Sequence, residues 1–409
     1  MLRSLFSGIS GLKAHQQMMD VVSNNIANVN TIGFKTSNVV FEDTLSQLMR
    51  ASSASTTTTG GLNPTQIGLG VQLGAVQTNF LQGSTQTTNK ATDLMVQGDG
   101  FFVLQDGNNK VYSRGGAFTL DSDGFMVNSN GMYAMGYAAT NGVVNSFGNL
   151  TKISMPTGLS IPGSATTSVT LGGNLSPTGT TTLTLTPTVY NINGAAAAVP
   201  ITLTPQVGST TGAYDIAILD PADPTGATQL ATGTVSFDAA GKFDIANTNP
   251  IQVTLPDAVG NSTVFNIDIS GLTGYSGTNS PTVTKSDGFT AGVLTQFQIG
   301  DDGVVTGIFS NSQKQALGQL AVATFNNPSG LEKLGDSVFR TSANSGLAEI
   351  GVAGSGGRGS LISGALEMSN VDLALEFTNM IIAQRAFSAN SKVITASDEM
   401  LQDLVNIKR

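Results

Sequence analysis

Apolar side chains recur at steps of three and four residues at both ends of the chain. The N-terminal repeat consists of Leu2, Leu5, Ile9, Leu12, Met19 and Ile26, and the C-terminal repeat consists of Leu373, Phe377, Met380, Phe387, Ile394, Leu401 and Val405. This spacing is typical of a coiled-coil seam. A helix of about 27 residues is about 40 Å long, which is too long for one small β domain to cover. The sequence therefore predicts two terminal helices that pair with each other.

Between the helices the pattern changes to that of strands and turns. Short apolar runs such as FFVLQ alternate with DG and GG over 71–147 and again over 286–352, which predicts one discontinuous β domain. Residues 148–285 are richer in Thr and Pro, with strand patterns such as TLTLT and IQVTL, and predict a second, inserted outer β domain. We therefore expect an α+β fold, mainly β, with two nested antiparallel β domains between paired helices.

The remaining segments are assigned by their composition. Residues 1–50 and 361–409 form the predicted terminal helical assembly domain, in which a short second helix is expected at Phe41–Arg50. The Ser/Thr-rich stretch within 51–70 and the Gly-rich stretch within 353–360 predict linkers.

One turn formula recurs in the β regions. Its order is apolar, any, apolar, acid, two residues and Gly, as in FTLDSDGF at 118–125 and VSFDAAGKF at 235–243. FQIGDDGVV at 297–305 is a looser version, with Gly300 at the position of the acid. The Gly can adopt a positive φ, and the Asp side chain can accept hydrogen bonds from the turn amides. These repeats predict structural turns rather than binding sites.

Composition narrows the classes of function. Only 11% of the 409 residues are charged, so much of the surface is polar but uncharged, and such surfaces can pack against copies of themselves without like-charge repulsion. An ordinary Thr-rich soluble β protein has the same composition. The net charge of −9 and the absence of a Lys/Arg cluster exclude nucleic acid as a partner.

The sequence also lacks cysteine and any long apolar stretch, and each absence excludes a class of site or segment. The chain has no Cys, which excludes disulfides, thiolate metal sites and a Cys nucleophile. No uninterrupted apolar stretch approaches 18 residues, so we expect no membrane insertion and no cleaved signal peptide.

The sequence patterns that could indicate a catalytic, metal or phosphate site are all incomplete. His15 is the only histidine, and it lies on the predicted N-terminal helix without a nucleophile turn nearby. DSDG at 121–124 and GDDG at 300–303 lack the order of ligands in a calcium loop, and GDGFF at 98–102 is followed by a strand rather than a helix. We therefore expect no catalytic, cofactor or metal site, and the protein is not expected to be an enzyme.

The terminal helices carry more apolar surface than one pairing can cover. Val22, Val29, Ile381, Ile382 and Val393 lie beside the predicted seams. A seam within one chain is the commoner explanation of such a pattern. Here the additional apolar side chains favour neighbours from other chains.

Three segments resemble a known family. They are MLRSLFSGISGLKAHQQMMDVVSNNIANVNTIGFK at the start, DGFFVLQDGNNKVYSRGGAFTLDSDGFMVNSNGMYAMGY in the first β region, and GALEMSNVDLALEFTNMIIAQRAFSANSKVITASDEMLQDLVNIKR at the end. They are similar to the bacterial flagellar hook and rod axial proteins and cover roughly half of the chain. The family motif residues in the first segment are Asn24, Asn25, Asn28, Asn30, Gly33, Phe34 and Lys35.

The resemblance implies a structural subunit that forms a homopolymer. The hook type, a curved flexible tube that transmits torque from rod to filament, is favoured because the distal-rod type is expected to be much shorter and to lack a large inserted domain. The implied partners are the distal rod protein, the hook cap, the hook-filament junction proteins and the flagellar export apparatus, and the implied location is the cell exterior. A distal-rod-type subunit and, from another class, a secreted β-domain adhesin are the alternatives.

Overall fold

The computed structural model describes residues 2–55, 59–156, 158–206, 212–223, 228–244, 250–256 and 262–407. The chain forms two compact units. Unit 1 comprises Met1–Pro156, Phe297–Thr306 and Gln315–Arg409, and unit 2 comprises Thr157–Gln296 and Gly307–Lys314.

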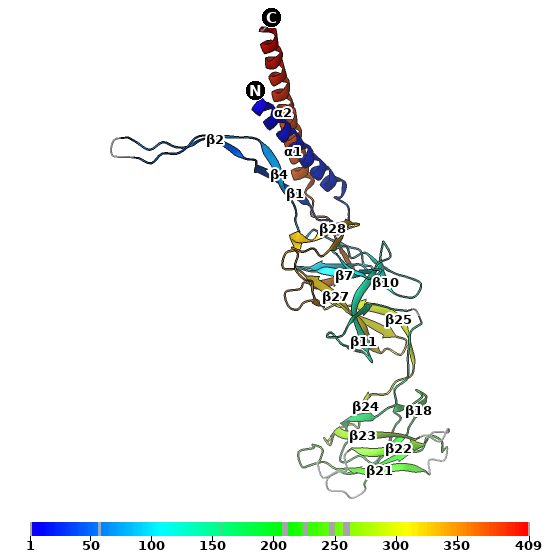
Figure 1. The fold of residues 1–409 in the computed structure, drawn as a ribbon. Helices are drawn as coiled ribbons and strands as arrows, with labels where there is room; N and C mark the ends of the chain where they lie inside the picture. The colour runs from blue at the N-terminus through cyan, green and yellow to red at the C-terminus, as the bar shows by residue number, and fades with distance from the viewer. Residues whose placement is uncertain are drawn as a thin grey trace. The chain divides into compact units, whose positions relative to one another are not determined.

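Unit 1 contains the two long helices, which Figure 1 labels α1 and α2, and most of the strands of the described residues. Its helices are α1 (Leu2–Ala27), α2 (Leu373–Ile407) and a short 3₁₀ helix, η1 (Pro328–Gly330). Its first strands are β1 (Ser37–Asp43), β2 (Ser46–Arg50), β3 (Thr65–Gly68), β4 (Val71–Thr78), β5 (Thr85–Thr87), β6 (Leu94–Gln97), β7 (Phe101–Asp106), β8 (Asn109–Ser113), β9 (Phe118–Leu120), β10 (Met126–Asn128), β11 (Tyr133–Thr140), β12 (Val143–Val144) and β13 (Leu150–Lys152). The later strands are β26 (Val304–Phe309), β27 (Lys314–Thr324), β28 (Glu332–Gly335), β29 (Val338–Arg340), β30 (Glu349–Val352), β31 (Ser360–Ser363) and β32 (Ala365–Glu367), of which β26 and β27 extend into unit 2 at one end.

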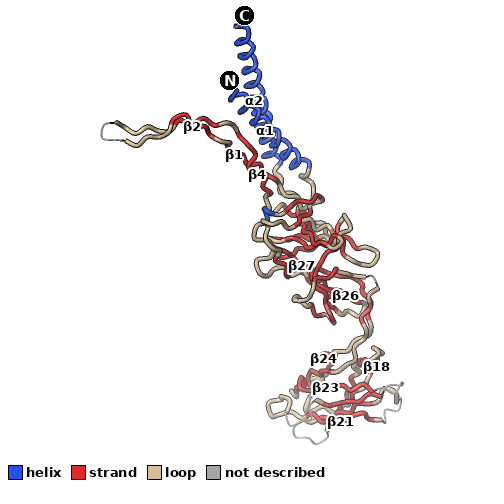
Figure 2. Tube along the Cα trace, in the orientation of Figure 1, coloured by secondary structure: helices blue, strands red, loops and turns tan. Residues whose placement is uncertain are grey.

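Unit 2 is built from strands in its described part (Figure 2). They are β14 (Ser160–Ile161), β15 (Ser168–Asn174), β16 (Leu183–Leu185), β17 (Thr188–Tyr190), β18 (Ala196–Ala198), β19 (Ile201–Pro205), β20 (Tyr214–Leu219), β21 (Gln229–Val235), β22 (Ile251–Pro256), β23 (Ser262–Thr273), β24 (Thr282–Ser286) and β25 (Gly292–Ile299), the last of which ends in unit 1.

The β core of unit 1 is a sheet of long and short strands with a hydrophobic cluster on each side. Its central strands follow the order β27-β11-β7-β8-β29-β28. Successive residues of β7 enter different clusters: Phe102 packs with Leu94 and Val322, whereas Phe101 packs with an aromatic group of Phe80, Phe325 and Phe339. This is the period-two alternation expected of a strand covered on both faces. The core combines residues that precede and follow unit 2 in the sequence, such as Phe102 and Val322.

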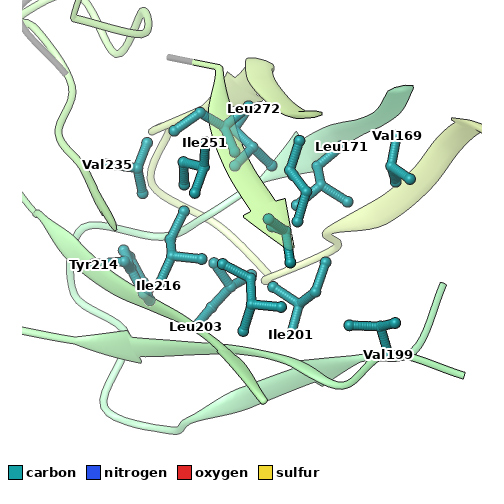
Figure 3. Packing of buried hydrophobic residues seen from close by; sticks show 14 of the residues in the cluster. Val169, Leu171, Val199, Ile201, Leu203, Tyr214, Ile216, Val235, Ile251 and Leu272 are labelled. Carbon is teal, nitrogen blue, oxygen red and sulfur yellow. The ribbon is translucent and has the colours of Figure 1, made fainter. Parts of the chain in front are cut away.

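Unit 2 is a two-sheet sandwich. One sheet has the order β22-β23-β15-β24 and the other has the order β16-β19-β20-β21. Every second residue of β22 is buried, and the side chains from both sheets meet in one cluster, as Figure 3 shows for Leu171, Leu203, Ile216 and Ile251. Strand β15 pairs with β23 in parallel, which is an exception to the predicted antiparallel order.

A long β-hairpin replaces the short helix predicted at Phe41–Arg50, and that prediction was wrong. Strand β1 pairs with β4, and β2 pairs with β3, both antiparallel. The run NVVFED alternates half-buried and exposed side chains, and its β-branched residues favour a strand over a helix. The predicted linker at 51–70 therefore contains β3, although residues 56–58 lie outside the described part of the chain.

Strand pairing also places other domain boundaries at residues different from the predicted ones. Strand β13 pairs with β11 of unit 1, so residues 150–152 do not belong to the inserted domain that was predicted to begin at 148. Unit 2 instead extends beyond 285 to Gln296. Strands β31 and β32 lie within the predicted C-terminal helical segment, where they pair with β6 and β5.

The recurrent turn formula folds as predicted in two places. The Asp121 carboxylate accepts hydrogen bonds from the amides of Asp123 and Phe125 at 3.0 and 2.7 Å, and Gly124 has φ +81°. The Asp238 carboxylate accepts from Ala240 and Lys242 at 2.8 Å in the same way. Both acids therefore stabilise turns.

Candidate assembly site

The two terminal helices pack through small residues. The buried positions of α1 include Gly8, Gly11 and Ala14, which are spaced by three. A Cβ atom on Gly11 would lie 2.7 Å from Asn390 Nδ2, and one on Gly8 would lie 3.3 Å from Ile394 Cγ1. The missing side chains let α1 approach α2 closely, so the helix pair depends on these glycines. The GxxGxxA spacing was the available sequence signal, and the seam analysis missed it.

The predicted seam residues of α1 lie beside this contact face, whereas Ile394 of the α2 seam lies on it, next to Gly8. Half-buried positions are Leu5, Leu12, Met19, Ile26, Met380, Phe387, Ile394 and Leu401, while the side chain of Leu2 lies outside the described structure. Ile9, Leu373, Phe377 and Val405 are exposed at 38, 40, 50 and 70%. The helix pair within one chain therefore leaves part of the predicted seam uncovered.

Other apolar side chains of the helices are also exposed. The largest exposed fractions on their outer faces belong to Phe6 at 65%, Leu375 at 58% and Ile382 at 53%. Of the predicted uncovered positions, Ile381, Ile382 and Val393 are exposed and Val29 is half-buried, but Val22 is buried at 4% against the expectation. Val22 lies on the same buried side of α1 as Gly8 and Gly11, which explains the difference.

Asn25 of the family motif connects α1 to both the hairpin and α2. Its Nδ2 donates to Ser37 O at 2.9 Å and to Glu376 Oε1 at 3.0 Å, and its Oδ1 accepts from Ser37 N at 3.1 Å. Asn25 is 1% exposed and Glu376 is 3% exposed. The side-chain amide therefore replaces a strand partner for β1 and holds the first turn of α2.

Desolvation by burial raises the pKa of Glu376, and the hydrogen bond from Asn25 opposes the rise. The other carboxylate oxygen, Oε2, has no hydrogen-bond partner among the described residues. Burial without full compensation favours the protonated acid. The contact between Asn25 and Glu376 is thus sensitive to pH.

The other motif residues form the turn after α1. The Asn28 Nδ2 donates to Asn24 O at 2.9 Å, and Asn28 Oδ1 accepts from Thr31 Oγ1 at 3.0 Å. Gly33 has φ +67°, and a Cβ there would lie 2.5 Å from Gly115 N. Glycine tolerates the positive φ and, because it has no Cβ, also the close approach of the Gly115 backbone.

Phe34 and Asn30 complete this turn in different environments. The Phe34 side chain is buried, with the Lys333 ammonium 4.1 Å from the centre of its ring. Asn30 is exposed. The structure thus brings Asn25, Gly33 and Phe34 into contact with α2 or with the β core and leaves Asn30 at the surface.

Lys35, the last motif residue, lies in a buried ion cluster. Its Nζ donates to Glu367 Oε1 at 2.6 Å and to Leu81 O at 2.7 Å, and Arg114 Nη1 lies 3.5 Å from Glu367 Oε2. The side chains of Lys35 and Glu367 are 0% exposed and that of Arg114 is 2% exposed. We call Lys35, Arg114 and Glu367 the junction cluster.

The junction cluster joins three distant parts of the chain. Lys35 follows α1, Arg114 follows β8, and Glu367 ends β32, shortly before α2. Glu367 Oε1 also accepts from Gly83 N at 2.9 Å, and its backbone carbonyl accepts from Gly33 N at 2.8 Å. Burial lowers the pKa of Lys35 and of Arg114, and the charge of Glu367 opposes both shifts. The cluster fixes the helix pair to the β core.

Sequence reasoning missed Arg114, Glu367 and Glu376. Each has a charged neighbour in the sequence, since Lys110 precedes Arg114 and Asp372 lies between Glu367 and Glu376. Local spacing therefore gave no signal for their burial, because the residues that they contact lie far away in the chain.

The base of the β-hairpin lies against α1. Val71 N donates to Ser10 Oγ at 3.3 Å, and the rings of His15 and Phe41 meet edge to face at 5.7 Å. The single histidine is therefore a packing residue in this structure. The distal strands β2 and β3 are exposed at every residue.

The described residues offer little for chemistry. No group of three or more His, Cys, Asp or Glu side chains in the described ranges could hold a metal ion. No helix in the described part of the chain is long and apolar enough to cross a membrane. An open cleft of about 700 Å³ lies beside the turn after α1, lined by Asn24, Asn28, Phe34 and Lys333 among others.

The sequence matches three protein families in different segments. They are "Flagella basal body rod protein" over residues 5–35, "Flagellar hook protein FlgE/F/G D1 domain" over 95–176 and "Flagellar basal body rod FlgEFG protein C-terminal" over 362–407. The first and last of these contain the motif residues and α2.

Curated relatives match the whole chain. The flagellar hook proteins FlgE of Borreliella burgdorferi and Treponema pallidum are each 36% identical to it, over 100% of both chains. A solved structure of the Helicobacter pylori flagellar hook protein FlgE2 covers 68% of this chain and 98% of its own, with a TM-score of 0.50 and 13% identity. The last comparison supports the fold alone.

A rod protein is also similar over the full length. The flagellar basal-body rod protein FlgG of Bacillus subtilis is 32% identical over 100% of both chains. The relatives that resemble this chain therefore include both hook and rod proteins. The full-length identity to hook proteins nevertheless settles the wider group, and the chain belongs to the flagellar hook and rod protein family.

Proposed function

We propose that the chain is the structural subunit of the flagellar hook. It assembles with copies of itself into a curved, flexible tube that transmits torque from the rod to the filament at the cell exterior. The identity to proteins named as flagellar hook protein supports this assignment.

The observation that carries the proposal is the uncovered apolar surface of the helix pair. Phe6, Phe377 and Ile382 are at least half-exposed on helices whose other faces are already paired. Exposed apolar patches of this kind are typical of interaction surfaces. In a homopolymer the helices of neighbouring copies cover them, together with the seam positions Ile9, Leu373 and Val405.

The β core of unit 1 and the β sandwich of unit 2 contribute the wall of the tube. Their surfaces are rich in Thr, Ser and Asn and poor in charge, because only 11% of the chain is charged. Neighbouring subunits can slide along such surfaces at low electrostatic cost when the tube bends. In this account unit 2 is the outer domain and needs no catalytic site, so the protein is not an enzyme.

The further partners are those at the two ends of the polymer. The distal rod protein lies below the first hook subunit, and the hook cap and the hook-filament junction proteins contact the growing or finished tip. The flagellar export apparatus supplies the subunits.

Electron microscopy of polymers tests the proposed function. The purified full-length chain is driven to polymerise with a salting-out salt and imaged in negative stain. Curved tubes with variable curvature are expected from a hook subunit. Straight, stiff tubes would instead favour the distal-rod type, to which the similar FlgG protein belongs. A monodisperse monomer would contradict both types.

A further inference from the structure

The outer faces of the two helices each carry a line of charged side chains. Lys13 and Asp20 are exposed on α1, and Arg385, Lys392 and Glu399 are exposed on α2. Each line repeats every seven residues, which is close to two helical turns, so its members lie above one another. At 100° per residue both lines lie opposite the buried faces of their helices.

These charges are not used within the chain. The ion pairs in the described ranges involve Lys35, Lys90, Arg114 and Arg340 with their acidic partners, and none involves the five side chains of the two lines. In a chain with so few charges, two straight unpaired lines on the assembly helices require an explanation.

We infer that the two lines are the complementary halves of a contact between two copies of this chain. The outer face of α1 in one copy lies on the outer face of α2 in a second copy, with Lys13 opposite Glu399 and Asp20 opposite Lys392. This inference rests on the proposed function, since it names the helix surface through which copies meet.

The direction of the contact follows from the fold. Asn25 near the end of α1 contacts Glu376 near the start of α2, so the helices run antiparallel within the chain. Subunits of a polar filament share one direction. The α1 helix of one copy therefore meets the α2 helix of the next copy in antiparallel orientation.

Charge fixes the register of this contact. When Lys13 faces Glu399, Asp20 faces Lys392, and both pairs attract. A shift of seven residues in one direction places Lys13 against Lys392, and a shift in the other direction places Asp20 against Glu399. Among these three registers only the first has two attractive pairs and no repulsive one.

This register differs from the pairing within one chain. There Gly11 lies at Asn390, which is about 11 residues away from the proposed alignment and corresponds to about 16 Å along a helix. The second copy is therefore staggered relative to the first. A staggered, heterologous contact does not close on itself and continues along a filament.

Apolar side chains beside the charged line of α2 add to the contact. Ile382, Val393 and Met400 flank it and are 53, 43 and 49% exposed. Burial of these side chains supplies affinity, while the two ion pairs supply register.

Charge exchange within one helix tests the contact at constant net charge. The α1 exchange is K13E with D20K, the α2 exchange is K392E with E399K, and the quadruple variant combines them. Each chain is polymerised with polyethylene glycol at about 10 mM ionic strength, where the Debye length is about 30 Å. The measurement is the critical concentration by sedimentation, with far-ultraviolet circular dichroism to verify the helices.

Each single-helix exchange turns two attractive pairs into two repulsive ones. We expect it to raise the critical concentration roughly ten-fold, and we expect the quadruple variant to return to within about two-fold of the parental chain. The matched control is R340E with E332R, which exchanges an existing exposed pair on the β core and should leave the critical concentration unchanged.

The outcomes separate the two proposals. If the single-helix exchanges polymerise like the parental chain, or if the quadruple variant is no better than either of them, the proposed contact is wrong while the hook function stands. If the parental chain itself forms no polymer, the proposed function fails and the contact fails with it.

Discussion

At the scale of residues, a few buried polar groups hold the terminal segments to the β core. The sequence identified Lys35, Asn25 and Gly33 through their resemblance to a family motif, but it did not identify their partners. Glu367 lies 332 positions from Lys35, and no local spacing encodes a contact at that separation. The residues of the site were therefore partly predictable and their pairing was not.

Removal of the single anion from the junction cluster tests its role. E367Q leaves Lys35 and Arg114 buried without a counter-charge, and we expect the free energy of unfolding of unit 1 to fall by about 3–5 kcal/mol. Urea denaturation followed by circular dichroism at 222 nm reports this unit, because both long helices belong to it.

E332Q is the matched control for E367Q. Glu332 also contacts a cation at 2.6 Å, but its pair with Arg340 is about half-exposed on both sides. Exposed pairs contribute less than about 1 kcal/mol. Equal losses in the two variants would show that burial of the junction cluster is irrelevant to stability.

The Asn25–Glu376 contact predicts a pH dependence. The pKa of Glu376 is raised in the folded chain, so the folded state binds this proton more tightly than the unfolded state does. The stabilising contribution is complete below the ordinary Glu pKa of 4.5 and is lost as the pH rises through the raised pKa of the folded state. The free energy of unfolding is compared between the parental chain and E376Q at pH 4.5 and 7.5.

E376Q keeps an acceptor for Asn25 but cannot titrate. We expect the parental chain to lose more stability than E376Q between the two pH values, since all other groups are shared. Equal changes in the two proteins would remove Glu376 as a titrating group of the helix junction.

At the scale of elements, the period of the apolar pattern predicted both long helices, but it did not predict which faces meet. A seam analysis follows large side chains, whereas α1 approaches α2 through Gly8 and Gly11. The hairpin was missed because apolar residues within Phe41–Arg50 have a spacing that fits both a helix and a strand. Its partner strand, β4, comes after a long polar stretch.

A large side chain at the helix contact tests this packing. In G11L the new side chain meets Asn390, and we expect the helix pair to lose about 1–3 kcal/mol despite the better helix propensity of Leu. Hydrogen exchange of the α1 amides measures the loss. S23L, at an exposed position of the same helix, should not increase exchange, and equal protection in both variants would contradict packing through glycine.

At the scale of the whole molecule, the nested order of domains was predictable because the turn formula and strand patterns of the first β domain return after the Thr-rich insertion. The boundaries were not, since they depend on which strands pair. Strand β13 looks like part of the insertion by composition but pairs with β11 in unit 1. Composition identifies domains, and hydrogen bonding between strands fixes where they end.

The central claim is that the terminal helices drive assembly and that unit 2 does not. Deletion of residues 166–287 removes most of unit 2 between Ser164 and Phe289, which already pair across an isolated bridge. Deletion of residues 1–27 and 373–409 removes α1 and α2 instead. The most direct measurement is negative-stain electron microscopy of both variants beside the full-length chain under polymerising conditions. We predict tubes from the full-length chain and from the chain without unit 2, and none from the chain without helices. Tubes from the helix-deleted chain, or their loss with unit 2 alone, would contradict the account.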